Sequence, residues 1–380
     1  MPEHSKQVLL IFELRMLGDA VLSIPFVRGA TTEYKVFVCC LPGSVEIFSR
    51  VLPGEQVLPW PAPWTVESGK YGLSKWRESG LHRLIESLRR LAPDIAVSVW
   101  ADARVHCLMG LSRARVRMGL PMNRRNHLAC NRPWRRRQVL AGRILTLVAG
   151  CLLRKPLLTH RVNRASADQH LLENWHQLAL ALNIPWDTST PWFSGYQPGN
   201  ADGYQQLRQL CRSARSAGRQ IWVVHPGARS PLRRWPLDRF QSLVDNVFAP
   251  ADIPLIIIRH PDGPPLIPRN NNQIAVDTPT FGDLVTVTDM ADCVLCNDSA
   301  AGHVGAALGK KVVSIFGPGS YEWFAPYGST DLVVSSNACP IRPCVDRCCL
   351  PSNICLQSVT VDMVATRITR LARRDGTTLS

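Results

Sequence analysis

The sequence predicts an α/β protein with two doubly wound parallel sheets, each in its own domain. The chain has 380 residues, which is long for a single hydrophobic core, so two domains are expected. Short apolar runs alternate with helical segments in both halves, an order typical of parallel sheets covered by helices. The clearest unit is 292–319, DCVLCNDSAAGHVGAALGKKVVSIFGPG, which has the pattern strand, tight turn, helix, strand.

The first half begins with an apolar run over 8–14, which predicts a strand. A glycine-bearing turn over 15–19 leads into a helical pattern over 20–30. The later predicted elements of this half are strands over 35–41, 94–100 and 115–120 and helices over 43–51, 81–91 and 168–183. This alternation favours a parallel sheet.

The second half begins after 184–202, a stretch rich in proline, serine, threonine and glycine that marks a domain boundary. Its predicted elements before 292–319 are helices over 204–217, 237–247 and 284–290 and strands over 220–224 and 254–259. We therefore expect Rossmann-like domains over 1–185 and 200–357. The final segment, 358–380, is expected to form a helix that packs back on the first domain.

Asp19 lies where the first predicted strand passes into the first predicted helix, directly after Gly18. In open α/β folds, ligands bind at this carboxyl edge of the strands. An aspartate at such a turn can cap the helix, act as a general base, or do both. Asp19 is therefore a candidate catalytic residue.

Two turns of the second half have the chemistry of an anion site. The turn HPGARSPLRRWP contains Gly227, which permits close approach of the backbone to a ligand, and the cations Arg229 and Arg233. The other turn is the helix start after Asp298, where free N–H groups and the helix dipole favour an anion. Together they predict a diphosphate site. The alternative is an ordinary crossover unit in which His303 is a core residue.

The phosphate chemistry of these turns differs from that of the common nucleotide folds. Neither GxxxxGK[ST] nor GxGxxG occurs, so neither a P-loop nor a typical dinucleotide fold is indicated. A nucleotide diphosphate is a leaving group in glycosyl transfer, which needs a base for the acceptor hydroxyl and positive charge for the departing diphosphate. One base without a covalent nucleophile predicts inversion at the anomeric carbon. No acidic pair lies near the site, so a metal need not hold the phosphates.

Three motifs in this order resemble glycosyltransferase family 9, the ADP-heptose:lipopolysaccharide heptosyltransferases. They are LRMLGDAVLSIPFVRGA, HPGARSPLRRWPLDRF and NDSAAGHVGAALGKKVVSIFGP. The resemblance spans about residues 8–364. It implies a GT-B type fold with a cleft between the two domains, a first domain that binds the acceptor and a second that binds the nucleotide sugar.

The resemblance also implies roles for individual residues. Asp19 matches the catalytic base, Arg233 matches a basic position, commonly lysine, that holds the donor phosphates, and Asp298 and His303 match the donor-binding pattern D-[ST]-G-x-x-H. The chain departs from that pattern at Ala300, where glycine is usual. The predicted donor-binding residues are Gly18, Gly227, Arg229, Arg233, Asp298, Ser299, Ala300 and His303. The departures leave the identity of the donor sugar open.

The formal net charge is +15, and one segment carries the whole excess. Fifteen Lys and Arg and no Asp or Glu occur over 103–167. Such a field favours an anionic partner. The candidate acceptor- and anion-binding residues are Arg124, Arg125, Arg135 and Arg136. A solvated basic face is the alternative, and no nucleic-acid fold signature accompanies the segment, so nucleic acid is not an expected partner.

An apolar run over 139–153 follows these arginines and is short for a transmembrane span of about 20 residues. Flanked by arginines, it resembles an interfacial helix, although a buried helix in the domain wall is an alternative. The amino-terminal residues lack the pattern of a signal peptide. We therefore expect a cytoplasmic protein that associates peripherally with the inner face of the cytoplasmic membrane.

Thirteen cysteines in such a chain are not expected to form a disulfide framework. Cys339, Cys344, Cys348 and Cys355 are spaced so that they could converge on a structural Zn or Fe. Free thiols and disulfides are the alternatives. Catalysis as predicted here requires no cofactor.

The predicted function, as the resemblance implies it, is transfer of a heptose from ADP-L-glycero-D-manno-heptose to the inner core of lipopolysaccharide. The partners would be the ADP-heptose donor and a phosphorylated lipid A–core acceptor. A transferase with another sugar, or with a protein or small-molecule acceptor, is an alternative. So is a non-catalytic, basic, membrane-binding protein on the same fold.

Overall fold

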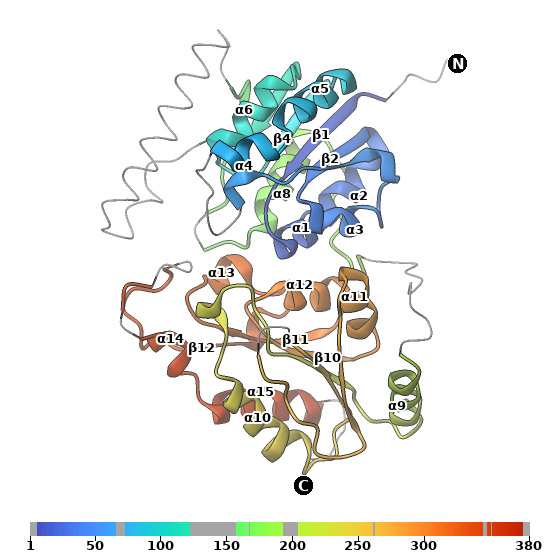
Figure 1. Ribbon diagram of the computed structural model, residues 1–380, viewed down its shortest axis with the longest axis vertical. Helices are drawn as coiled ribbons and strands as arrows, with labels where there is room; N and C mark the ends of the chain where they lie inside the picture. The colour runs from blue at the N-terminus through green and yellow to red at the C-terminus, as the bar shows by residue number, and fades with distance from the viewer. Residues whose placement is uncertain are drawn as a thin grey trace. The chain divides into compact units, whose positions relative to one another are not determined.

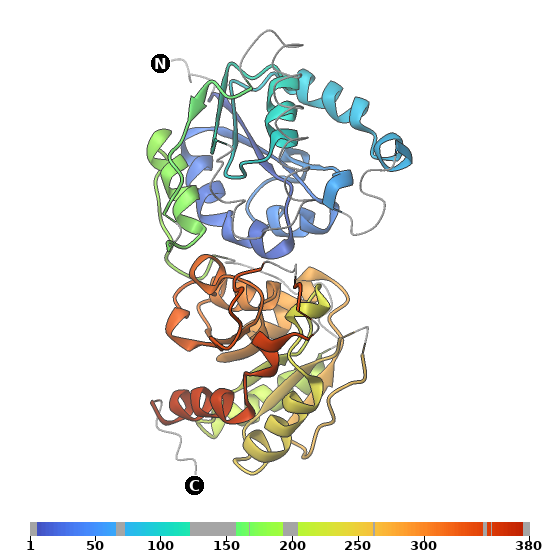
Figure 2. The same ribbon diagram turned by 90° about the vertical axis from the view of Figure 1, so that its left-hand side faces the viewer.

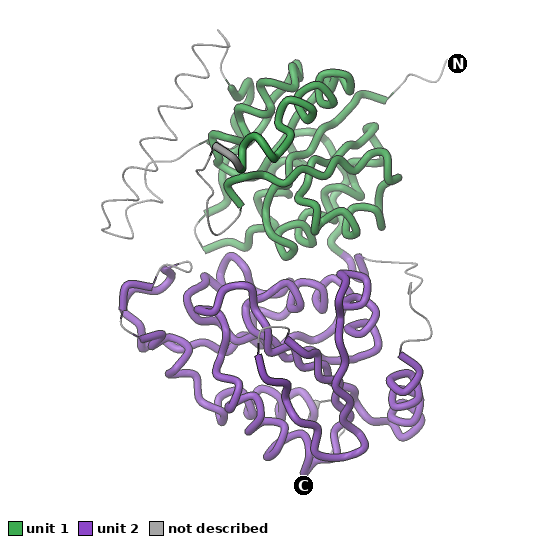
Figure 3. Tube along the Cα trace, in the orientation of Figure 1, with its two compact units in different colours: residues 1–188 green, residues 189–380 purple. Residues whose placement is uncertain are grey.

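The structure is a computed structural model that describes residues 6–65, 73–121, 157–166, 168–192, 204–260, 263–344, 348–350 and 352–374. The chain divides into two compact units, residues 1–188 and 189–380 (Figure 3). Each unit contains a parallel sheet of six described strands with helices packed against it (Figures 1 and 2). The predicted α/β class, with one doubly wound sheet in each half, is confirmed.

The sheet of the first unit has the order β3-β2-β1-β4-β5-β6, so the chain starts in the middle and moves outward in both directions. Its strands are β1 (Val8–Glu13), β2 (Lys35–Cys40), β3 (Val57–Pro59), β4 (Ile95–Ser98), β5 (Val116–Gly119) and β6 (His160–Arg161). Leu9, Leu10, Ile11 and Phe12 of β1 are all 0% exposed. Since successive strand residues point to opposite faces, both faces of this sheet are covered.

The described helices of the first unit are α1 (Leu17–Leu22), α2 (Ile24–Glu33), α3 (Val45–Phe48), α4 (Leu73–Glu78), α5 (Leu81–Leu91), α6 (Ala103–Leu111) and α8 (Leu172–Ala181). The sequence predicted one helix over 20–30, but the structure has α1 and α2 on either side of Ser23. Pro25 explains the break, because proline has no N–H to continue the bonding ladder of α1.

The sheet of the second unit has the order β12-β11-β10-β7-β8-β9. Its strands are β7 (Trp222–His225), β8 (Leu255–Ile258), β9 (Gln273–Val276), β10 (Cys293–Asn297), β11 (Lys311–Phe316) and β12 (Val333–Ser335). The sequence missed β9 and β12, as it missed β3 and β6. All four are the outermost strands of their sheets and none is buried along its whole length, so none shows a clear apolar run.

The described α-helices of the second unit are α9 (Gln205–Ser216), α10 (Leu237–Leu243), α11 (Phe281–Asp289), α12 (Ala300–Ala307), α13 (Tyr321–Phe324), α14 (Ile354–Gln357) and α15 (Val361–Arg374). Glycines bring α12 close to β10 and β11. A Cβ on Gly305 would lie 2.9 Å from Val294 Cγ2 and 3.1 Å from Val312 Cγ2, so a larger residue would force the helix away.

The final helix packs within the second unit, which differs from the expectation for 358–380. Val364, Ile368 and Leu371 of α15 are buried in one core cluster with Trp235 and Phe240. The apolar face of α15 thus packs on the sheet and on α10 of its own unit (Figure 1). The sequence predicted the helix, but not the surface on which its apolar face packs.

Candidate functional site

The predicted base, Asp19, lies in the first turn of α1 just beyond the carboxyl end of β1. The Met16 backbone N–H donates to Asp19 Oδ2 at 3.3 Å, so the carboxylate caps the start of its own helix. The residue is half-buried, and Gly18 precedes it in the same turn. Both alternatives for an aspartate at this turn are therefore compatible with its position.

Behind this turn lies Glu13, the last residue of β1, whose carboxyl group is completely buried. Trp100, which follows β4, donates its indole N–H to Glu13 Oε2 at 2.9 Å and to Oε1 at 3.1 Å. Burial, and next the charge of Asp19, raise the pKa of Glu13 to about 8, against the lowering effects of the Trp100 hydrogen bond and of Arg15. Glu13 is therefore protonated at neutral pH.

Two arginines stack on indole rings at the same edge of the sheet. The guanidinium carbon of Arg15 lies 4.2 Å from the centre of the Trp100 ring, and that of Arg104 lies 4.8 Å from the Trp64 ring. Asp102 caps α6, and its carboxylate accepts hydrogen bonds from Arg104 Nη2 at 2.6 Å and Arg104 Nε at 2.9 Å. Cationic and aromatic groups thus surround the carboxyl ends of β1 and β4.

In the second unit, Asp298 and Arg233 meet. Arg233, at the end of a 3-10 turn, places Nη1 3.2 Å from Asp298 Oδ2, directly after β10. The Asp298 side chain is 3% exposed and that of Arg233 is 26% exposed. Gly319 makes room for the carboxylate, because a Cβ at that position would lie 2.3 Å from Asp298 Oδ2. A buried aspartate therefore holds one arginine at the start of α12.

The predicted helix start is also present. Ser299 is the N-cap of α12 with an extended backbone (φ −152°, ψ 169°), and Ala300 is the first helical residue. The Ser299 hydroxyl is buried and has no hydrogen-bond partner among the residues that the structure describes. His303 lies one turn further along α12 and is 7% exposed. The N–H groups of the first turn of α12 thus lie next to the Arg233–Asp298 pair.

Asn297, fully buried at the end of β10, joins the neighbouring turns. Its Nδ2 donates to the Pro226 carbonyl at 2.6 Å, and its Oδ1 accepts from the Trp235 N–H at 3.0 Å. Both side-chain groups are satisfied by backbone, which is the usual condition for burying an amide. Asn297 therefore fixes the turn after β7 and the arginine loop to the strand that carries Asp298.

The turn after β7 contains Gly227, which packs between two histidines. A Cβ at Gly227 would lie 2.2 Å from His260 Cδ2 and 3.0 Å from His225 Cε1. Burial, and next the proximity of His260, lower the pKa of His225 to about 4, so His225 is neutral at physiological pH. Arg229 follows in the same turn with an exposed side chain.

The structure thus brings together the predicted donor residues of the second half. Strands β7 and β10 are neighbours in the sheet, so the turn with Gly227 and Arg229 lies beside the turn with Asp298 and Ser299. Asp19 and Gly18 belong to the first unit. The predicted cleft between the domains remains a prediction. The predicted acceptor residues Arg124, Arg125, Arg135 and Arg136, and the apolar run over 139–153, lie outside the described residues.

Sequence reasoning missed Glu13 and Asn297 as parts of the site. A carboxylate at the end of an otherwise apolar strand was a usable signal for Glu13, because a buried acid needs a special environment. Asn297 directly precedes Asp298, but its local sequence gave no sign of its contacts. Its two partners lie 62 and 71 residues away in the chain, and no local pattern shows them.

Cys339, Cys348 and Cys355 are free thiols. Burial, and next the neighbouring Cys339, raise the pKa of Cys355, with a smaller effect of Cys344. Among the described residues, no group of three or more His, Cys, Asp or Glu is arranged to hold a metal ion. The structural Zn or Fe therefore stays a prediction.

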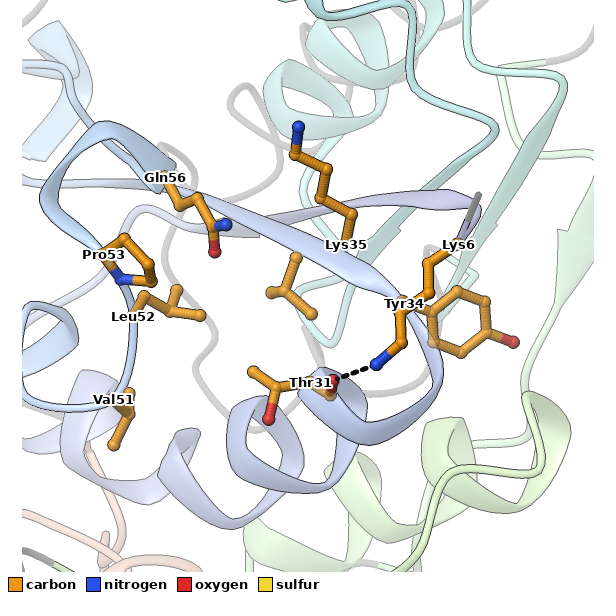
Figure 4. Close-up of a pocket in the computed structure, with 9 residues that line it drawn as sticks. Lys6, Thr31, Tyr34, Lys35, Val51, Leu52, Pro53 and Gln56 are labelled. Atoms are coloured by element: carbon orange, nitrogen blue, oxygen red, sulfur yellow. Dashed lines mark hydrogen bonds between the residues drawn. The ribbon is translucent and has the colours of Figure 1, made fainter. Parts of the chain in front are cut away.

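A hollow of about 540 Å³ lies in the first unit at the amino ends of β1 and β2, opposite to the ends that carry the Asp19 turn (Figure 4). It is bordered by Lys6, which precedes β1, and Lys35, which begins β2. Lys6 Nζ donates to the Thr31 and Thr32 carbonyls at the end of α2, at 3.0 and 2.8 Å. Because it lies at the amino ends of the strands, this hollow is separate from the Asp19 turn.

No described helix is long and apolar enough to cross a membrane.

The family model of glycosyltransferase family 9 (heptosyltransferase) matches residues 269–354, which include Asp298, Ser299 and His303. A curated relative, lipopolysaccharide heptosyltransferase 3 of Escherichia coli, is 25% identical over 121 residues. That alignment covers 30% of this chain and 35% of the relative, so it spans about a third of the relative's length. The resemblance read from the motifs is thus confirmed.

Solved structures match over almost the whole chain. ADP-heptose lipopolysaccharide heptosyltransferase II of E. coli has a TM-score of 0.61 at 16% identity, covering 97% of this chain and 99% of that one. The E. coli heptosyltransferase WaaC with ADP-2-deoxy-2-fluoro heptose has a TM-score of 0.62 at 16% identity, covering 96% of this chain and all of that one. The likeness confirms the predicted GT-B type of fold.

Proposed function

Residues 269–354 belong to glycosyltransferase family 9, and from that premise we propose that the chain is an inverting glycosyltransferase. The observation that carries the proposal is the contrast between two carboxylates at strand-to-helix turns. Asp19 is half-buried and accepts from a backbone N–H, whereas Asp298 is buried against Arg233. One acid is thus accessible to a substrate, and the other holds a cation.

In the proposed reaction, Asp19 accepts the proton of an acceptor hydroxyl. As the O–H bond breaks, the oxygen attacks the anomeric carbon of the donor sugar, and the bond from that carbon to the diphosphate oxygen breaks. No covalent intermediate is needed, so the configuration inverts. Because Glu13 is protonated at neutral pH, it adds no second negative charge beside the base.

Negative charge collects on the departing nucleotide diphosphate, and the second unit supplies the groups that stabilise it. Arg233 can give two parallel hydrogen bonds to phosphate oxygens, and Asp298 holds its guanidinium in place. The N-terminal N–H groups of α12 supply further donors. These groups are in place before the charge develops, which is the arrangement that lowers a transition-state barrier.

We propose ADP-L-glycero-D-manno-heptose as the donor and a phosphorylated lipid A–core as the acceptor. Support comes from the relatives, which include a lipopolysaccharide heptosyltransferase and a heptosyltransferase bound to an ADP-heptose analogue. The excess of positive charge over 103–167 suits a phosphorylated lipid and the inner face of the cytoplasmic membrane, with which the protein would associate peripherally.

The decisive variant is Asp19→Asn, which keeps the shape of the side chain and removes its basicity. We expect transfer to fall by at least about 10²-fold while ADP affinity stays unchanged. ADP, UDP and GDP are titrated calorimetrically into wild type and variant, and transfer is followed with ADP-heptose and lipid A–core. Preferential binding of UDP or GDP would overturn the heptose donor.

Asp94→Asn is the matched control. Asp94 Oδ2 accepts the Val8 N–H at 2.9 Å, so it also receives a backbone hydrogen bond in the first unit, but at the amino end of the sheet. Transfer by this variant is expected to stay within about twofold of wild type. Normal turnover by Asp19→Asn would remove Asp19 as the base.

A further inference from the structure

The segment that follows the cysteine-rich stretch returns to the Arg233 loop. Asn353 stands at the start of α14, and its Nδ2 donates to the Leu232 carbonyl at 2.7 Å across 121 residues of sequence. Leu232 is the direct neighbour of Arg233. The hydrogen bond therefore fixes the backbone immediately before the arginine that meets Asp298.

The Cys355 thiol determines how the Asn353 amide is oriented. Cys355 Sγ lies 3.0 Å from Asn353 Oδ1 and donates to it. Since a carboxamide has one acceptor oxygen and one donor nitrogen, engaging the oxygen leaves Nδ2 directed at Leu232. Cys355 is 3% exposed, so this contact is shielded from water.

The arginine loop is anchored on its other side as well. Trp235 donates its backbone N–H to Asn297 Oδ1 at 3.0 Å and its indole N–H to the Val359 carbonyl at 2.9 Å. Arg233 thus lies between two fixed points, Leu232 and Trp235. Both Asn353 and Val359 belong to the same stretch of chain, 353–359.

That stretch also contacts the turn behind Asp298. A Cβ on Gly317 would lie 2.5 Å from Leu356 Cγ, so Leu356 packs directly on the Gly317 backbone. Two residues later, Gly319 abuts the Asp298 carboxylate. Residues 353–359 therefore touch the loop of Arg233 and the turn that accommodates Asp298.

We propose that Asn353, oriented by the Cys355 thiol, is a positioning residue that holds the Arg233 loop ready for the donor diphosphate. The proposal rests on the proposed function, because it assigns Arg233 to the diphosphate. Ordering an arginine loop before the ligand arrives removes part of the entropy cost of binding. Asn353 acts through Leu232 and Arg233 and touches no reacting atom.

The first test is calorimetric titration of full-length variants with ADP. Asn353→Ala is expected to weaken ADP binding about tenfold, the effect of losing one partly buried hydrogen bond that orders the loop. Cys355→Ala is expected to weaken it about threefold, and Cys355→Ser to restore it, because the hydroxyl replaces the thiol as donor. Unchanged ADP affinity in Asn353→Ala would overturn the proposal, as would equal ADP affinity in Cys355→Ser and Cys355→Ala.

Asn270→Ala is the matched control, because Asn270 Nδ2 also donates to a backbone carbonyl of the second unit, that of Ala249 at 3.5 Å. Its ADP affinity should equal that of wild type. If Asn270→Ala loses as much ADP affinity as Asn353→Ala, both losses come from general destabilisation. That result would overturn the positioning role of Asn353.

A double-mutant cycle with Arg233→Ala separates this inference from the proposed function. If Asn353 acts through Arg233, Asn353→Ala weakens ADP binding in wild type and has no further effect in the Arg233→Ala background. Additive losses would overturn the inference while leaving Arg233 as a diphosphate ligand. Unchanged ADP affinity in Arg233→Ala itself would remove Arg233 from the donor site and refute that part of the proposed function.

Discussion

Asp19 and Asp298 each lie where a strand of a parallel sheet passes into a helix, Asp19 in the first turn of α1 and Asp298 just before the N-cap of α12. Their surroundings are opposite in character. Asp19 is half-buried, caps α1 and lies near the neutral Glu13. Asp298 is 4% exposed and lies 3.2 Å from a guanidinium nitrogen of Arg233. The same local geometry therefore supports an accessible carboxylate in one unit and a buried ion pair in the other.

In the proposed function, this difference divides the work of one reaction between the two units. A base must exchange a proton with a substrate, so it needs access to solvent or substrate. A residue that holds an arginine needs burial and a fixed partner, because an unpaired buried charge is costly. The turn provides the position, and the neighbouring strands determine which role the carboxylate can take.

The most direct change to this comparison comes from Asp298→Asn. The amide removes the charge that balances Arg233, so we expect the second unit to lose about 2 kcal/mol of stability and ADP affinity to fall more than tenfold. Asp19→Asn, at the half-buried turn, is expected to change stability by less than about 0.5 kcal/mol. Thermal denaturation and ADP titration of both variants measure this contrast. Equal stability losses in the two variants would contradict it.

The second prediction concerns Glu13, whose pKa is raised by burial to about 8 from 4.5. The fold favours the protonated form, so its contribution to stability is complete below pH 4.5, declines as pH rises and is lost above about pH 8. Glu13→Gln stays neutral throughout. We expect its stability relative to wild type to rise by a few kcal/mol between pH 5 and 9, at roughly 1.4 kcal/mol per pKa unit.

The measurement is denaturation of both proteins across that pH range, with Glu46→Gln as a control on the surface of the same unit. Glu46 forms an i,i+4 pair with Arg50, and its side chain is 43% exposed. The control should show no comparable difference. A stability difference between Glu13→Gln and wild type that is independent of pH would show that Glu13 is ionised in the folded protein at neutral pH.

The smallest expected effect is that of Arg233→Lys, which keeps the positive charge and loses the planar fork. A lysine can still reach Asp298 and a phosphate as a point charge, so we expect ADP affinity to fall about fivefold. Arg229→Lys, in the exposed turn after β7, should change ADP affinity less. Titration of both variants with ADP ranks the two arginines by their contribution to ADP affinity. A larger loss in Arg229→Lys would assign the main diphosphate contact to the turn after β7.

Much of the fold was predictable from local patterns. The apolar runs that became β1, β2, β4, β7, β8, β10 and β11 are recognisable because both of their faces are buried. Turn chemistry located Asp19 and Asp298, since glycine, aspartate and serine at a strand end have limited alternatives. The short edge strands β3, β6, β9 and β12 could not be found this way, because their pairing depends on a neighbour distant in sequence.

The sequence by itself determined the class of fold, the two halves and the turns that carry the candidate site, because these follow from periodicity and capping among near neighbours. The tertiary structure alone decided that Glu13 is buried under Trp100, 87 residues away, that Arg233 meets Asp298, and that Asn353 reaches Leu232. It also decided that α15 packs on its own unit. These contacts set charge states and positions, and they depend on which strands lie side by side, which no local pattern encodes.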